Sequence, residues 1–246
     1  MTEERMKKNE ENFQKLSIKK PDKVQYGVFS WGPCIVHLRI SDDFKKVLLE
    51  EAELSRKKNL DYREKLAGVI KEEYSFHSKE KVLPYISQCL GIYDQAWQKF
   101  KNVFYKPENK PQYLLSALWV NYMKRYEYNP PHDHSDELSF VIFLDVPQAI
   151  RDEQKAFVGN SGGPGSLGFL YGEGNRQAIT YQATMPQTGD MFIFPAWVKH
   201  YVAPFYSDVT RISVSGNVAN SIELNKLNEH NKAKFVKIKG EDGPKR

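Results

Sequence analysis

The sequence predicts an α+β protein with a mainly β core, in which helices pack on one face of a β-barrel or sandwich. From about residue 113 to residue 218 the chain is a succession of short runs rich in β-branched and aromatic residues, separated by Gly and Pro clusters. Before residue 113 two segments have the apolar spacing of helices. Helices followed by many short strands are typical of helices gathered on one side of an antiparallel core.

The chain is expected to form one catalytic domain, because 246 residues that are 40% hydrophobic are enough for a single sizeable core. Residues 1–23 are polar and predict an N-terminal segment. Residues 24–112 predict a helical support region with short strands, which belongs to the same domain. Residues 113–220 are the expected β core, and residues 221–246 are a polar C-terminal tail.

The support region begins with two expected strands around the turn at Gly32-Pro33. Ser41, followed by two aspartates, is a candidate N-cap for a helix that runs to about Arg56. A longer helix is expected from about Lys79 to Lys101, because its apolar residues recur with a period near 3.6. The expected strands of the core are about 114–128, 138–146, 167–171, 177–184, 190–194, 199–205 and 209–217.

Composition limits the function classes. The formal charge of +5 is modest and comes largely from Lys-rich ends, so it does not indicate a nucleic-acid partner. Cys34 and Cys89 form no CxxC pair, and neither a secretory signal nor a membrane span is recognisable. We therefore expect a protein of the cytoplasm.

Two histidines stand two positions apart between two apolar runs. In an extended chain, side chains at i and i+2 point to the same face, so His132 and His134 are expected to form a chelating pair. Pro130 and Pro131 precede them and suit a strand that leaves the sheet at its rim. Asp136 continues the spacing, either as a carboxylate ligand or as an acceptor that orients an imidazole.

A third histidine, His200, ends the segment GDMFIFPAWVKH, in which an apolar strand leads into a Pro-Ala-Trp rim. Such a rim would bring one imidazole to the mouth of a barrel. Three protein ligands on one side of a metal leave positions open, which non-haem Fe(II) oxygenases need for a bidentate co-substrate and O₂.

The segment TRISVSGN carries a polar face. Alternation places Arg211, Ser213, Ser215 and Asn217 on one side of this expected strand. Inside a β-rich core an unpaired guanidinium is costly, so this face indicates an anionic or polar ligand. The alternative is that the face is exposed to solvent.

Together these motifs resemble the prolyl-4-hydroxylase-like superfamily of Fe(II)/2-oxoglutarate oxygenases, with HxH in place of the usual HxD. The stretch NPPHDHSDELSFVI is similar to oxygenases of marine bacteria and their phages. The resemblance covers about residues 113–218. It implies a double-stranded β-helix, or jelly roll, with buttressing helices from the N-terminal region.

For the metal, the resemblance implies that His132 and His200 are the first and distal Fe(II) ligands. His134 then occupies the position usually held by an acid. Either the site has three histidines, or Asp136 supplies the carboxylate and His132 lies outside the ligand set. The three-histidine site is favoured, because Asn-Pro-Pro-His aligns His132 with the family's first ligand.

For the co-substrate, the resemblance implies that Arg211 pairs with the distal carboxylate of 2-oxoglutarate and that Ser213 donates to it. Asn121 is a candidate for a further contact. The implied reaction is oxidative decarboxylation of 2-oxoglutarate by O₂, coupled to hydroxylation of a substrate C–H. The primary substrate is unknown, and a peptidyl residue such as proline is the first candidate.

Two other functions remain open. Cupin metalloenzymes also carry HxH on a β-barrel, but they have a glutamate shortly after the second histidine, where this chain has Leu138 and Ser139. A non-catalytic scaffold or virion-associated protein could keep the fold without the chemistry. Convergence of the three imidazoles distinguishes the metal sites from the scaffold.

Overall fold

The computed structural model describes residues 32–65, 67–100, 112–173, 180–220 and 236–237. The expected N-terminal segment, the expected strand before Gly32-Pro33 and nearly all of the C-terminal tail lie outside these described residues. The division of the chain into regions of one domain stays a prediction.

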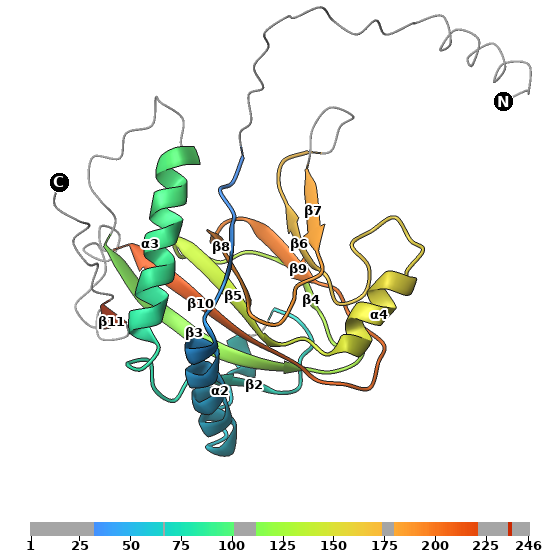
Figure 1. The fold of residues 1–246 in the computed structure, drawn as a ribbon, viewed down its shortest axis with the longest axis horizontal. Coiled ribbons are helices and arrows are strands. Elements are labelled where there is room, and N and C mark those ends of the chain that lie inside the picture. The colour runs from blue at the N-terminus through green and yellow to red at the C-terminus, as the bar shows by residue number, and fades with distance from the viewer. Residues whose placement is uncertain (1–31, 66, 101–111, 174–179, 221–235, 238–246) are drawn as a thin grey trace, which may run out of the picture. The chain divides into compact units, whose positions relative to one another are not determined.

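Two antiparallel sheets form the core (Figure 1). The larger sheet has the order β1 (Val36–Arg39), β8 (Asp190–Pro195), β5 (Leu138–Asp145), β10 (Arg211–Asn220), β3 (Tyr113–Met123) and β11 (Val236–Lys237), and β2 (Glu73–Ser75) also pairs with β3. The smaller sheet has the order β4 (Asn129–His132), β9 (Lys199–Val202), β6 (Leu167–Leu170) and β7 (Tyr181–Thr184). Neighbouring strands come from distant parts of the chain, as in a jelly roll, and the predicted fold class is confirmed.

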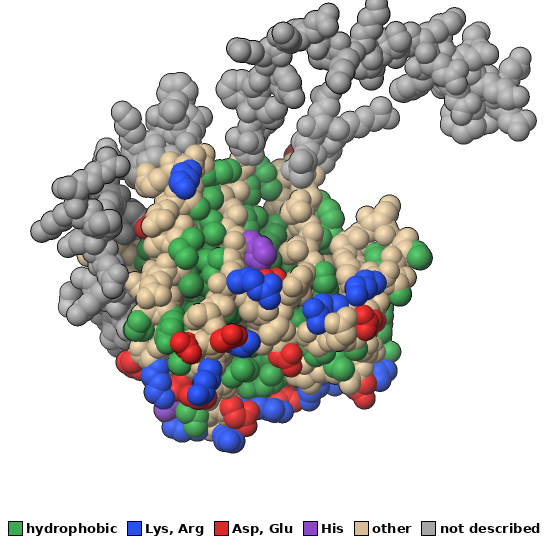
Figure 2. All heavy atoms as spheres, in the orientation of Figure 1, with side chains coloured by type: hydrophobic (Ala, Val, Ile, Leu, Met, Phe, Trp, Pro, Cys, Tyr) green, Lys and Arg blue, Asp and Glu red, His purple; other side chains and the backbone are tan. Residues whose placement is uncertain are grey.

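Helices α2 (Asp42–Lys57) and α3 (Leu83–Phe100) share one hydrophobic cluster with the larger sheet. As predicted, Ser41 caps α2, and its Oγ accepts a hydrogen bond from the Phe44 backbone N at 3.2 Å. Figure 2 shows positive and negative side chains intermixed over the lower part of one face, where α2 lies. Both helices therefore bury an apolar stripe against strands and present charge to water.

Strand β5 is buried on both of its faces. Phe140 and Ile142 belong to the cluster that includes the helices, whereas Val141 and Phe143 belong to a second cluster with residues of the smaller sheet. This double burial explains why residues 140–144 form one continuous apolar run in the sequence rather than an alternating strand.

The strand expected over residues 114–128 is shorter in the structure. Strand β3 ends at Met123, and the chain turns at Tyr126, which has a positive φ of 64°. The Glu127 carboxylate accepts a hydrogen bond from the Lys124 backbone N at 2.8 Å and so closes the turn. The chain then enters β4, a short strand that contains both prolines.

Several short elements were not predicted. Strand β2 has three residues in a charged segment, and η1 (Arg63–Lys65) has three exposed ones. Helix α4 (Gln148–Ala156) has nine residues and buries only Ile150, so it is shorter than the stretch over which apolar spacing identifies a helix. Strand β11 lies in the expected polar tail.

Both cysteines, Cys34 and Cys89, are free and buried in the structure. Among the described residues, no helix combines the length and the apolar character needed to cross a membrane.

Candidate metal centre

Three histidines converge where β4 and β9 meet. His132 and His200 are paired residues in the antiparallel register of these strands, and His134 follows two positions after the end of β4. One ring nitrogen from each histidine lies within 4.8 Å of the others. The ring centroids are 4.3 Å apart for His132 and His200, and 5.1 and 5.2 Å for the two pairs with His134. The three rings are thus gathered around one point.

Two of the rings are held by the backbone just before them. His132 Nδ1 is 2.8 Å from the Pro130 carbonyl oxygen, and His200 Nδ1 is 3.0 Å from the Val198 carbonyl oxygen. A carbonyl can only accept, so each Nδ1 carries the proton and each Nε2 keeps its lone pair. This is the orientation that a metal ligand needs.

The local environment keeps two of these imidazoles neutral. Burial lowers the pKa of His200 to about 3, and burial followed by the nearby His132 lowers the pKa of His134 to about 4. The rings of Phe194 and His200 lie 4.7 Å apart, so aromatic side chains cover one side of the centre. At neutral pH both histidines are unprotonated and able to bind a metal ion.

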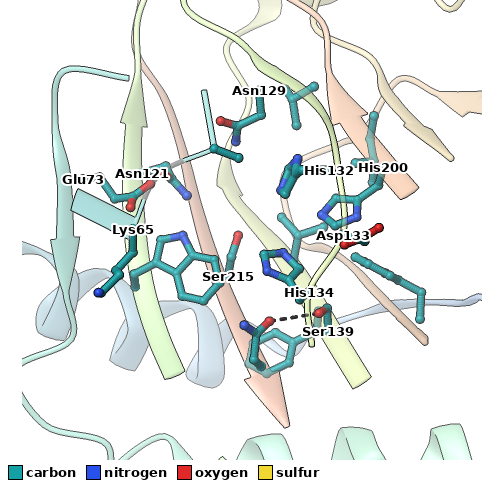
Figure 3. Close-up of a pocket in the computed structure, with 18 residues that line it drawn as sticks. Lys65, Glu73, Asn121, Asn129, His132, Asp133, His134, Ser139, His200 and Ser215 are labelled. Carbon is teal, nitrogen blue, oxygen red and sulfur yellow. Dashed lines mark hydrogen bonds between the residues drawn. The ribbon is translucent and has the colours of Figure 1, made fainter. Parts of the chain in front are cut away.

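The histidines line a cavity of about 140 Å³ between the two sheets. Figure 3 shows His132, His134 and His200 on one side of it, with Glu73 and Asn121 next to each other on the opposite side. A cavity of comparable volume admits a benzene-sized molecule, so this space suits small groups or one side chain.

Arg211 is buried at the start of β10, with 2% of its surface exposed. Its Nη1 donates to the Gly165 carbonyl oxygen at 2.8 Å, Nη2 lies 2.8 Å from the sulfur of Met123, and Nε has no hydrogen-bond partner. None of the ion pairs of the described residues includes Arg211. Burial lowers its pKa to about 10, so the group is still charged at neutral pH and lacks a counter-ion.

The polar face of β10 reaches from this arginine to the cavity. Ser215 and Asn217 line the cavity, whereas Arg211 and Ser213 are buried beyond it on the same strand. Ser213 is paired in register with Asn121 of β3, which does line the cavity. Asn121 is 4% exposed, and its Oδ1 has no hydrogen-bond partner.

Asp136, the alternative metal ligand, lies outside the histidine group. Its Oδ2 accepts a hydrogen bond from the Ser116 hydroxyl at 3.0 Å. His37 is also outside the histidine group. Its Nε2 lies 3.1 Å from Oδ1 of Asp190, and its ring stacks on the ring of Phe192.

Sequence reasoning missed most of the other lining residues, among them Lys65, Glu73, Trp119 and Asn129. The alternation of β3 could have placed Trp119 on the same face as Asn121. The sequence around Glu73 gives no sign of a site, because only the pairing of β2 with β3 brings this residue to the cavity.

Residues 117–217 match the model of the family described as "Putative 2OG-Fe(II) oxygenase". Over these residues the chain is similar to the 2OG-Fe(II) oxygenases. The matched residues contain all three histidines and Arg211. The inferred resemblance is thereby confirmed, together with the Fe(II) and 2-oxoglutarate dependence of the family; the likeness to proteins of marine bacteria and phages stays a prediction.

Two solved structures with a TM-score of 0.50 support the fold. A prolyl hydroxylase from Trichoplax adhaerens, in complex with a hypoxia inducible factor peptide fragment, is similar with a TM-score of 0.50 and 12% identity over 93% of this chain and 98% of the other. The carbocyclase SnoK from nogalamycin biosynthesis, a non-heme alpha ketoglutarate dependent enzyme, has the same TM-score and 12% identity over 79% and 86%. A prolyl-4-hydroxylase from Pseudomonas putida has a TM-score of 0.47 and 13% identity over 75% and 91%. The search of curated protein sequences gave no match.

The residues present fit the cofactor and co-substrate of the family. Imidazole nitrogens are suitable ligands for iron, and three of them converge. A buried guanidinium with an unpartnered Nε matches a carboxylate.

Proposed function

We propose that the protein is a hydroxylase that uses His132, His134 and His200 to hold Fe(II) and Arg211 to anchor 2-oxoglutarate. The observation that carries the proposal is the convergence of three imidazoles on one cavity within the matched oxygenase segment. The proposed reaction converts a substrate C–H, 2-oxoglutarate and O₂ into C–OH, succinate and CO₂. One oxygen atom enters the hydroxyl group and the other enters succinate.

When bound, Fe(II) with 2-oxoglutarate and O₂ supplies the oxidising chemistry, and the chain supplies position and exclusion of water. The Pro130 and Val198 carbonyls fix the ring orientation of His132 and His200, so their Nε2 atoms face the same point. Phe194 beside His200 keeps water from that side of the centre.

The three-histidine ligand set is preferred to one that includes Asp136. The Asp136 carboxylate is outside the group of converging nitrogens and already accepts a hydrogen bond from Ser116. Three neutral ligands leave the full charge of Fe(II) uncompensated, so the co-substrate carboxylates would supply the negative charge that an acidic ligand provides in other members.

The proposed anchor for the distal carboxylate of 2-oxoglutarate is Arg211. The charge of Arg211 lacks a partner in the described part of the chain, and leaving a charge buried without a partner is costly. Ser213 and Asn121 are the proposed further contacts, because they are register neighbours between Arg211 and the histidines.

The primary substrate is proposed to be a protein or peptide residue, by analogy with the similar structure that contains a peptide fragment. The free, buried cysteines support the cytoplasmic setting expected from the sequence.

Calorimetric titration of 2-oxoglutarate into Fe(II)-loaded protein under nitrogen tests this proposal. We expect binding to the wild type, loss of at least tenfold in affinity for Arg211→Met, and loss of both metal and 2-oxoglutarate for His200→Ala. Lys65→Met is the matched control, because Lys65 is a cation that lines the cavity itself, with a side chain that is 63% exposed. Equal losses for Arg211→Met and Lys65→Met would contradict the anchor, and unchanged metal binding in His200→Ala would contradict the ligand set.

A further inference from the structure

The cavity lining carries three hydrogen-bond acceptors without partners, and two of them, on Glu73 and Asn121, lie on the side opposite the histidines. Glu73 and Asn121 are paired in the register of β2 and β3, and they are 2% and 4% exposed. Three buried oxygen atoms have no hydrogen-bond partner: Oε2 of Glu73, Oδ1 of Asn121 and Oδ1 of Asn129. All three residues line the cavity. We call Glu73, Asn121 and Asn129 the acceptor wall.

Glu73 has no counter-ion in the described part of the chain. None of the ion pairs found there includes it. Lys65 lines the same cavity, but its side chain is largely in solvent, with Nζ 3.8 Å from a Glu64 carboxylate oxygen. Burial and then the negative charge of Asp61 raise the pKa of Glu73 to about 8. The residues around Glu73 therefore disfavour its ionised form and do not compensate its charge.

Of the three side chains, the Glu73 carboxyl group indicates most clearly which kind of ligand would bind at the acceptor wall. The side chain of Asn121 or Asn129 can present either its oxygen or its nitrogen, and Glu73 can donate while it holds its proton. A nearby cation favours the ionised form of Glu73, and an ionised carboxylate can only accept. The partner that satisfies Glu73 with its neighbours is a group with several N–H donors and a positive charge. Trp119 of the same cavity adds an indole, the aromatic group that attracts cations most strongly.

We propose that the acceptor wall binds a cationic nitrogen group of the primary substrate, an alkylammonium or a guanidinium. This inference rests on the proposed function. The cavity of about 140 Å³ has room for one such group, and the histidines lie on the opposite side. A substrate held by its nitrogen group at Glu73 would therefore present its neighbouring carbons toward the metal centre, so the acceptor wall selects the substrate and also positions the C–H.

A matched pair of probes tests the charge requirement. Butylguanidinium carries the proposed charge, and butylurea is its neutral isostere. Each is titrated calorimetrically into protein loaded with Fe(II) and 2-oxoglutarate under nitrogen. We expect butylguanidinium to bind the wild type at least tenfold more tightly than butylurea. Equal affinities, or no binding of butylguanidinium, would overturn the proposal.

Variants of Glu73 test the residue. Glu73→Gln keeps the size but removes the charge, and we expect it to lose at least tenfold in affinity for butylguanidinium. Glu73→Asp keeps the charge and should retain more of that affinity than Glu73→Gln does. Lys65→Gln, at the same cavity, should not weaken binding. Unchanged affinity in Glu73→Gln, or equal losses in all three variants, would overturn the proposal.

The same titrations separate this inference from the proposed function. The wild type must first bind 2-oxoglutarate in the presence of Fe(II), and failure there would contradict the proposed function before any probe is added. If the wild type binds both 2-oxoglutarate and butylguanidinium, the variant can be interpreted. A Glu73→Gln protein that keeps its affinity for 2-oxoglutarate but loses butylguanidinium binding assigns the loss to the acceptor wall.

Discussion

Replacement of Glu73 by glutamine is expected to stabilise the protein, by an amount that grows with pH. Burial raises the pKa of this carboxyl from 4.5 to about 8, a rise of about 3.5. Between these two values the unfolded chain has released the proton while the folded chain still holds it. Stability therefore falls with increasing pH, by about 1.4 kcal/mol per pH unit, and the loss approaches 4–5 kcal/mol above pH 8. Glutamine has no proton to release, so this loss is absent from the variant.

Urea unfolding of both proteins at pH 5, 6, 7, 8 and 9 measures the effect. The difference in the free energy of unfolding, Glu73→Gln minus wild type, isolates residue 73 because all other groups are common to both. We expect it to rise by about 3–4 kcal/mol from pH 5 to pH 8 and to level off above that. Glu53→Gln, on the exposed side of α2, is a control expected to change stability by less than about 1 kcal/mol at every pH. A difference for Glu73→Gln that does not vary with pH would refute the reasoning.

Four further substitutions have defined outcomes. His200→Ala should lower Fe(II) affinity at least 100-fold and leave the far-UV circular dichroism spectrum unchanged, and an unfolded variant would show that His200 is structural. In the absence of 2-oxoglutarate, Arg211→Met should raise the free energy of unfolding by about 1–3 kcal/mol, because an apolar side chain replaces an unpaired buried charge. If urea unfolding shows that the variant is less stable than the wild type, the charge of Arg211 is paired. Gly216→Ala should lower the free energy of unfolding by about 2–3 kcal/mol, because the new Cβ would lie 2.9 Å from the Ala117 carbonyl oxygen and closer still to the Phe140 ring. In Gly91→Ala, within α3, the new Cβ meets no atom within 4 Å, and the free energy of unfolding should rise by up to about 1 kcal/mol.

The three proposed metal ligands could be predicted from the sequence because local rules place them. The spacing of His132 and His134 puts both side chains on one face, and the rim after the apolar strand brings His200 to the same end of the barrel. Arg211 was predictable for a similar reason, since it begins a strand with an alternating polar face.

The acceptor wall was not predictable, because long-range pairing creates it. Glu73 lies in a charged segment with no recognisable period, and its three-residue strand exists only through hydrogen bonds to β3. Local patterns carry no information about such a partner. Helix α4 was missed for another reason, because its nine residues are fewer than the window in which apolar spacing identifies a helix.

The uncharged ligand set of the proposed metal centre has a consequence for the order of assembly. Three neutral imidazoles give Fe(II) no opposing charge, so metal alone would bind more weakly than it does where an acid completes the site. The carboxylates of 2-oxoglutarate would supply that charge, and each partner would then strengthen the binding of the other by the same factor. The protein would accordingly favour two states, empty or loaded with both, and a half-filled centre would be rare.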